Sequence, residues 1–221
     1  MFDFLEGYDL LGAFWVTVQL TVYSAAGALV WGTVLAAMRV SPPALLRGFG
    51  TAYVNVVRNI PLTVIIVFTS LGLFQTLGVN LGADDFTSVN FRLAVLGLTV
   101  YTSAFVCEAV RSGINTVPAG QIEAARALGL TFFQVLRLIV LPQAFRSVVG
   151  PLANVLIALT KNTTVAAAIG VAEAAALMRE MIENEAQLIL ISGVFAFGFI
   201  CLTLPTGLLL GRVSRKVSVK R

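Results

Sequence analysis

The feature that most constrains the fold of this chain is a set of long runs without any charged residue. Residues 10–38, 59–83 and 186–211 contain no Asp, Glu, Lys or Arg. A helix of about 20 apolar residues crosses the hydrocarbon core of a bilayer, so each run is long enough to span a membrane. Only 12% of the chain is charged, about half the fraction usual in a soluble domain. We therefore expect an all-α membrane protein.

Two further spans are interrupted by polar residues. The uncharged run 93–107 makes only about 22 Å of helix, so its helix must continue through Glu108 and Arg111 to cross. These two side chains lie three residues apart on one helical face and can form a structural ion pair. Residues 147–172 form another span with a polar break. The sequence thus predicts one domain with five transmembrane helices, at about 11–38, 60–78, 90–111, 145–171 and 187–210.

The charges between these spans predict the orientation of the chain. Segments 1–9, 78–92 and 170–187 together hold two basic and nine acidic residues, whereas segments 39–58, 108–146 and 212–221 hold twelve basic and two acidic residues. Cytoplasmic loops of membrane proteins carry an excess of Lys and Arg. We therefore expect the N-terminus outside and the C-terminus in the cytoplasm. The net charge of +4 reflects this topology and gives no reason to expect nucleic-acid binding.

Several classes of chemistry are excluded by what the sequence lacks. It has no histidine, and its two cysteines, Cys107 and Cys201, both lie in apolar runs. Histidine-dependent catalytic triads, histidine metal sites and a disulfide framework are therefore excluded. Glu108 and Glu123 do not form a convincing catalytic carboxylate pair. We expect no catalytic residue and no metal site.

The segment from about 115 to 142 is a soluble-looking insert on the cytoplasmic side. Pro118 can open a first short helix, and the alanines that follow favour helix strongly with little side-chain bulk. Gly129 suits the left-handed residue that ends a helix. Thr131 and Gln134 form a capping-box pattern for a second helix, which Pro142 stops or kinks. An alanine-lined helix can dock into a protein groove, although these patterns alone equally describe an amphipathic interfacial linker.

The insert carries a recognisable pattern. Glu123, Ala124 and Ala125 are followed at fixed spacing by Gly129, Ile139, Leu141 and Pro142, which resembles in full the EAA motif of ABC-importer permeases. Segments 58–61, 101–113 and 161–164 look like the polar amino-acid branch of that family, which handles histidine, arginine, glutamine, glutamate and opines. The resemblance covers roughly residues 12–212. It departs at 59–60, where Asn and Ile replace the expected glycine and hydroxyl residue.

The resemblance implies a type I ABC-importer permease fold, with transport and ATP hydrolysis carried out by separate subunits. The ATPase-coupling residues would be Glu123, Ala124, Ala125, Gly129, Leu141 and Pro142. The chain would bind no cofactor itself, and ATP and Mg²⁺ would sit on a cytoplasmic ATP-binding subunit; the chain indeed has no phosphate-binding glycine-rich loop. The other implied partners are a second permease subunit, identical or paralogous, an extracytoplasmic solute-binding protein and the lipid of a bacterial cytoplasmic (inner) membrane.

One polar site inside the fourth span is a candidate for contact with the solute. Lys161 lies about 21 Å along the helix from Ser147, and a charge at that depth usually lines a cavity or is paired. We hypothesise that Lys161, Asn162, Thr163 and Thr164 hold the carboxylate of an amino acid in transit. Alternatively, Lys161 reaches the outer interface or caps the carbonyls of a broken helix. The neutral Asn162 offers no carboxylate to a cationic solute, which favours glutamate or glutamine over arginine.

Two other classes of membrane protein remain open at this point. An ion-coupled secondary transporter can also use a broken helix with a buried charge, but it normally has internal repeats and more spans. A non-transporting membrane scaffold would explain the small residues on helix faces but not Lys161.

Overall fold

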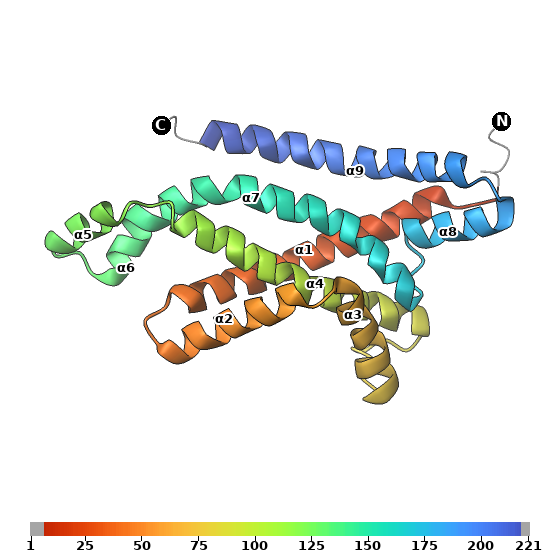
Figure 1. The fold of residues 1–221 in the computed structure, drawn as a ribbon, viewed down its shortest axis with the longest axis horizontal. Helices are drawn as coiled ribbons and strands as arrows, with labels where there is room; N and C mark the ends of the chain where they lie inside the picture. The colour runs from red at the N-terminus through yellow and green to blue at the C-terminus, as the bar shows by residue number, and fades with distance from the viewer. Residues whose placement is uncertain (1–6, 218–221) are drawn as a thin grey trace.

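The computed structural model describes residues 7–217, and all regular secondary structure in that range is helical. The charged residues of 1–6 and 218–221 that entered the charge count lie outside the described range. In chain order, the elements are the following, of which Figure 1 labels the α-helices: α1 (Leu10–Val40), α2 (Ala44–Asn59), α3 (Leu62–Val67), η2 (Phe68–Thr76), α4 (Phe86–Ile114), α5 (Ala119–Ala127), α6 (Phe132–Val135), η3 (Leu136–Val140), α7 (Leu141–Asn162), η4 (Thr163–Ile169), α8 (Ala174–Glu185) and α9 (Leu188–Val217).

The architecture confirms the prediction of an all-α membrane protein with about five spans. Four helical stretches are long and apolar enough to cross a membrane, namely 10–40, 86–114, 132–169 and 188–212. A fifth crossing is reached if the bent pair 44–59 and 62–76 is taken as one span. Aspartates begin two of these helices, because the side chains of Asp9 and Asp85 accept hydrogen bonds from the backbone N–H groups of Gly12 and Ser88.

The centre of the bundle is the close contact between α1 and α4. The small residues Ser24, Ala28, Gly32 and Ala36, spaced four apart on α1, are all buried. A Cβ atom added at Gly32 would come within 2.7 Å of the carbonyl oxygen of Ser103. Small residues on one face allow two helix backbones to approach closely in a membrane, and here they bring α1 against α4.

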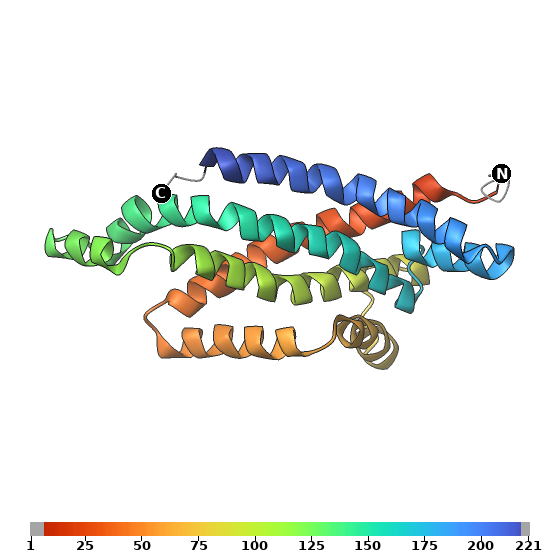
Figure 2. The ribbon, with the colours of Figure 1, turned by 45° about the horizontal axis from the view of Figure 1, so that its top comes forward.

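The second predicted span differs from the sequence expectation. Residues 39–58 were expected to be a cytoplasmic loop, but most of them form α2, which runs back beside α1 and α4 (Figures 1 and 2). The chain then bends by 103° before the helical stretch 62–76. Pro61 lies at the bend, because proline disfavours a helical conformation of the residue before it. The bend places Arg58 at the far end of α2, away from the loop to which its charge was assigned.

The fourth span is longer than expected. The second helix of the insert was expected to stop or kink at Pro142. It does not stop there, because α6, η3 and α7 follow one another without a gap from Phe132 to Asn162. The stretch directly before Pro142 is π-helical, which accommodates the N–H that proline lacks. The chain therefore leads from the insert into the membrane through consecutive helical segments.

Candidate functional site

The insert folds into a small helical protrusion, formed by α5, α6 and η3, at one end of the bundle (Figure 1). An apolar cluster holds it together, with Val117, Ala125, Val135 and Val140 buried at its centre. Thr131 and Gln134 form the predicted capping box at the start of α6. The last described turns of α9 lie at the same end of the bundle, whereas α1 begins at the opposite end.

A glycine turn ends α5 and leads the chain into α6. Gly129 has a φ of 84°, in the left-handed region. Its N–H donates to the carbonyl of Arg126, and the N–H of Leu130 donates to the carbonyl of Ala125, at 2.9 and 3.1 Å. This pair of hydrogen bonds is a Schellman motif, which closes the helix end. Gly129 therefore adopts the conformation that the sequence predicted for it.

The predicted coupling residues have different surroundings in this protrusion. Glu123, Ala124, Leu141 and Pro142 are exposed, whereas Ala125 faces the apolar cluster and is only 3% exposed. Ala125 thus helps to hold the protrusion together and does not present a surface to a partner. The largest exposed apolar side chains beside the glycine turn are Leu128 and Phe133, at 82% and 78%.

The sequence reasoning did not single out these two apolar residues, nor the link that braces the protrusion. The side-chain amide of Gln143 on α7 donates to the side-chain oxygen of Gln121 on α5, at 2.8 Å. Leu128 and Phe133 could have been noticed as bulky residues that flank a glycine turn. The glutamine pair carries no sequence signal, because its two members lie 22 positions apart.

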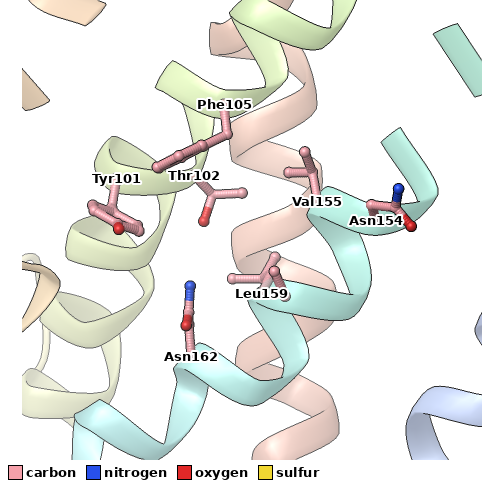
Figure 3. A pocket seen from close by; sticks show the side chains of 8 residues that line it. Tyr101, Thr102, Phe105, Asn154, Val155, Leu159 and Asn162 are labelled. Carbon is pink, nitrogen blue, oxygen red and sulfur yellow. The ribbon is translucent and has the colours of Figure 1, made fainter. Parts of the chain in front are cut away.

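The second candidate site is a groove between α4 and α7 (Figure 3). It encloses about 300 Å³, at the lower end of the range of small-molecule sites. Its walls combine aromatic, aliphatic and amide side chains, contributed by Tyr101, Thr102, Phe105, Asn154, Val155, Ala158, Leu159 and Asn162.

Two polar groups border the groove. The hydroxyl of Thr102 is buried and finds no hydrogen-bond partner among the described residues. In Figure 3 the amide of Asn162 points toward Thr102 from the opposite wall. A buried hydroxyl without a partner is energetically unfavourable, which makes Thr102 a candidate for a hydrogen bond that forms only when the groove is occupied.

Of the four predicted pathway residues, Asn162 alone belongs to the walls of this groove. Lys161 is exposed. The hydroxyls of Thr163 and Thr164 donate to the carbonyls of Thr160 and Lys161, each at 2.8 Å. These two threonines therefore stabilise the change from α7 to the 3₁₀ helix η4.

Glu108 has ion-pair partners on two other helices. The structure pairs its carboxylate closely with Arg39 of α1 and places Arg58 of α2 at 4.0 Å. The predicted pair with Arg111 is not among the ion pairs of the described residues. Arg39 was not considered as a partner because it lies 69 positions from Glu108, and only the packing of α1 on α4 brings them together. The guanidinium of Arg58 also lies over the ring of Phe105, 5.6 Å from its centre.

Comparisons with known proteins agree with these features. Residues 28–219 match the model of a family described as "Binding-protein-dependent transport system inner membrane component". The glutamate transport system permease protein GluC of Corynebacterium efficiens is 56% identical over 97% of this chain and 96% of its own length. The glutamate/aspartate import permease protein GltK of Escherichia coli is 32% identical over 95% of this chain and 93% of its own.

A solved structure described as an amino acid ABC transporter with histidines has a similar fold. It matches with a TM-score of 0.83 and 26% identity, over 94% of this chain and 93% of that one.

Proposed function

Because this chain belongs to the family of binding-protein-dependent transport system inner membrane components, we propose that it is one of two membrane-spanning subunits of an ATP-driven importer of acidic amino acids. Two relatives that match nearly the whole chain are named for glutamate or glutamate and aspartate transport. Both come from bacteria, so the chain is proposed to reside in a bacterial inner membrane, with its N-terminus outside.

The observation that carries this proposal is the protrusion with its exposed apolar tip. Leu128 and Phe133 have no covering residues in the described chain, and Glu123 and Ala124 of the same protrusion are exposed as well. Exposed apolar patches rimmed by polar residues commonly mark protein interfaces. The proposed partner at this tip is a separate cytoplasmic ATP-binding subunit, which would also hold the ATP and Mg²⁺. A binding protein outside the membrane would deliver the solute.

The helical path from protrusion to groove supports a coupling mechanism. The segments α6, η3 and α7 follow without a gap, and the far part of α7 carries Val155, Leu159 and Asn162 in the groove wall. Closure of the ATP-binding subunits would move the protrusion, and α7 would pass that movement to the groove. Such rigid-body movement of packed helices is one of the established routes of alternating conformations.

For the solute, we propose that Asn162 and Thr102 bind from opposite walls and that Lys161, next in the chain, attracts a carboxylate to the groove. An exposed ammonium group beside a polar groove raises the local concentration of anions. Thr163 and Thr164 set the helix geometry that presents Asn162.

The test is glutamate uptake by the complete importer reconstituted in vesicles, with ATP inside and binding protein outside. We expect uptake by the native complex, a loss of about tenfold or more in Lys161→Ala, and substantial retention in Lys161→Arg, which keeps the charge. Native uptake driven by an ion gradient without ATP would favour a secondary transporter instead. Undiminished uptake by Lys161→Ala would remove Lys161 from the pathway.

A further inference from the structure

We infer that one exposed face of α7 lines the solute pathway along most of the span, and that Asn154, halfway along this face, is a further contact for the solute. This inference rests on the proposed function, because the pathway is that of the proposed importer. It extends the pathway from Asn162 toward the protrusion, along a part of α7 to which the proposed function assigns no solute contact.

The face consists of exposed residues that share one side of the helix. Ser147, Pro151, Asn154, Ala158 and Lys161 follow one another at alternating intervals of four and three residues, and each is exposed. The distance from the first to the last is about 21 Å along the helix. Asn154 and Ala158 also belong to the walls of the groove between α4 and α7. The face therefore adjoins the groove and continues beyond it.

The composition of this face differs from that of the surfaces that suit lipid. Other spans expose large apolar side chains, such as Trp15 and Val30 on α1 and Ile200 and Leu204 on α9. No large apolar side chain is exposed between 146 and 187, a stretch that the structure describes in full. A helix surface in contact with hydrocarbon is normally apolar. The exposed face of α7 is therefore built to meet something more polar than lipid.

Asn154 gives the sharpest form of this argument. Its side-chain amide has no hydrogen-bond partner among the residues that the structure describes, and in Figure 3 it points away from α4. Pro151 adds an acceptor nearby, because it has no N–H to donate to the carbonyl of Ser147 four residues earlier. Polar groups left without partners in hydrocarbon are strongly unfavourable. These groups therefore require water or a polar partner.

The adjoining groove shows which kind of partner is expected. The hydroxyl of Thr102 is buried there without a hydrogen-bond partner among the described residues, so the groove itself favours a polar occupant. Lys161 is the exposed charge at the other end of the face, and charges within spans usually line water-filled cavities. A hydrated path that passes Lys161, the groove and Asn154 satisfies all of these groups together.

The test is the reactivity of a single cysteine in the complete importer. Subunits carrying Asn154→Cys, in a background with Cys107→Ala and Cys201→Ala, are assembled in lipid nanodiscs, which leave both sides open to solvent. A charged, water-soluble methanethiosulfonate reagent is added with and without ATP, so that a pathway closed in one state is sampled in the other. The reagent modifies thiolates, so we expect Asn154→Cys to react at least about tenfold faster than a cysteine in contact with lipid.

Leu208→Cys is the matched control. Leu208 is exposed on α9, and a Cβ atom added at its neighbour Gly207 would lie 3.3 Å from the side chain of Ile157 on α7. The control thus lies at a depth similar to that of Asn154, but on the apolar surface. A rate for Asn154→Cys no higher than that of Leu208→Cys would overturn the inference, whether lipid or a dry contact with another subunit covers the residue.

Modification should also block transport. We expect the Asn154→Cys importer, reconstituted in vesicles, to lose most of its glutamate uptake when the reagent attaches a bulky group in the path, and Leu208→Cys to keep its uptake. Fast modification that leaves uptake unchanged would overturn the role of Asn154 as a solute contact. Ala158→Cys, one turn away on the same face, answers both questions if Asn154→Cys does not assemble.

The outcomes also separate this inference from the proposed function. A native complex without ATP-driven glutamate uptake would refute the proposed function, whatever the reaction rates are. Native uptake together with slow modification at both Asn154→Cys and Ala158→Cys would refute the inference alone.

Discussion

At the scale of single residues, Glu173 shows how this chain handles a carboxylate away from water. It has no exposed surface and caps α8, accepting a hydrogen bond from the N–H of Ala176 at 2.9 Å. Its second oxygen accepts from the hydroxyl of Thr17 on α1, at 3.4 Å. The hydroxyl of Thr17 in turn accepts from the N–H of Ala174 at 3.2 Å. Glu173 and Thr17 together join α8 to the first span.

This burial predicts a dependence of stability on pH. Burial raises the pKa of Glu173 above the ordinary carboxyl value of 4.5, although the hydrogen bonds from Ala175, Ala176 and Thr17 oppose the rise. The folded protein then binds this proton more tightly than the unfolded chain does. The resulting stabilisation is fully present below the ordinary pKa and is lost as the pH rises through the raised pKa.

We expect Glu173→Gln to remove this contribution, because its amide oxygen can still cap α8 without carrying a charge. The melting temperature of the purified complex is measured for both proteins between about pH 5 and pH 8. The native protein should lose several degrees relative to the variant toward the alkaline end. Parallel curves for the two proteins would show that Glu173 does not titrate in this range.

At the scale of elements, the protrusion shows how short helices can be kept in a fixed orientation relative to the long helix α7. Its helices are too short to be stable alone in water, so the capping box, the Schellman motif and the apolar cluster around Ala125 must together order it. The glutamine pair between α5 and α7 adds a further link. The protrusion is thus braced against the long helix that leads to the groove.

Gly129 is the position at which this direction can be changed. A β-branched residue in its left-handed conformation costs about 1–2 kcal/mol, so Gly129→Val should displace α5 without unfolding the spans. We expect the purified variant to retain its helix content and lose most of the co-purifying ATP-binding subunit and of the transport activity. Gly129→Asn is the control, since asparagine tolerates this conformation better than most residues. Native levels of both properties in Gly129→Val would show that the turn does not aim the docking helix.

At the scale of the whole molecule, the described chain places unlike surfaces at its two ends. The α1–α2 connection, the protrusion and the last described turns of α9 gather at one end, whereas the start of α1, the start of α4 and α8 lie at the other (Figures 1 and 2). Excluding Arg58, which α2 carries away from its loop, leaves eleven basic and two acidic residues on the predicted cytoplasmic side. The predicted cytoplasmic side therefore remains strongly basic even when Arg58 is not counted there.

This arrangement predicts which residues a reagent can reach from each side of the membrane. In a background with Cys107→Ala and Cys201→Ala, a membrane-impermeant maleimide should label Asp84→Cys in intact cells. Ala44→Cys, at the start of α2, should be labelled only after the membrane is opened. Both positions are exposed in the described chain, so the side of the membrane decides the outcome. The reverse pattern would invert the predicted orientation.

The sequence by itself determined the class of protein, the number of spans and the local structure of the insert. Each of these depends on residues close together in the chain: uncharged runs long enough to cross a bilayer, and caps and a glycine within a few positions of each other. For the same reason the left-handed Gly129 and the capping box of Thr131 and Gln134 could be predicted before any tertiary contact was known.

Only the tertiary structure decided which contacts the charged and polar side chains make. The pairing of Glu108 with Arg39, the position of Arg58 over Phe105 and the groove that joins Thr102 to Asn162 all depend on helices that are distant in sequence. Local sequence cannot specify such contacts, because the face that one helix turns toward another follows from the packing of small residues along both.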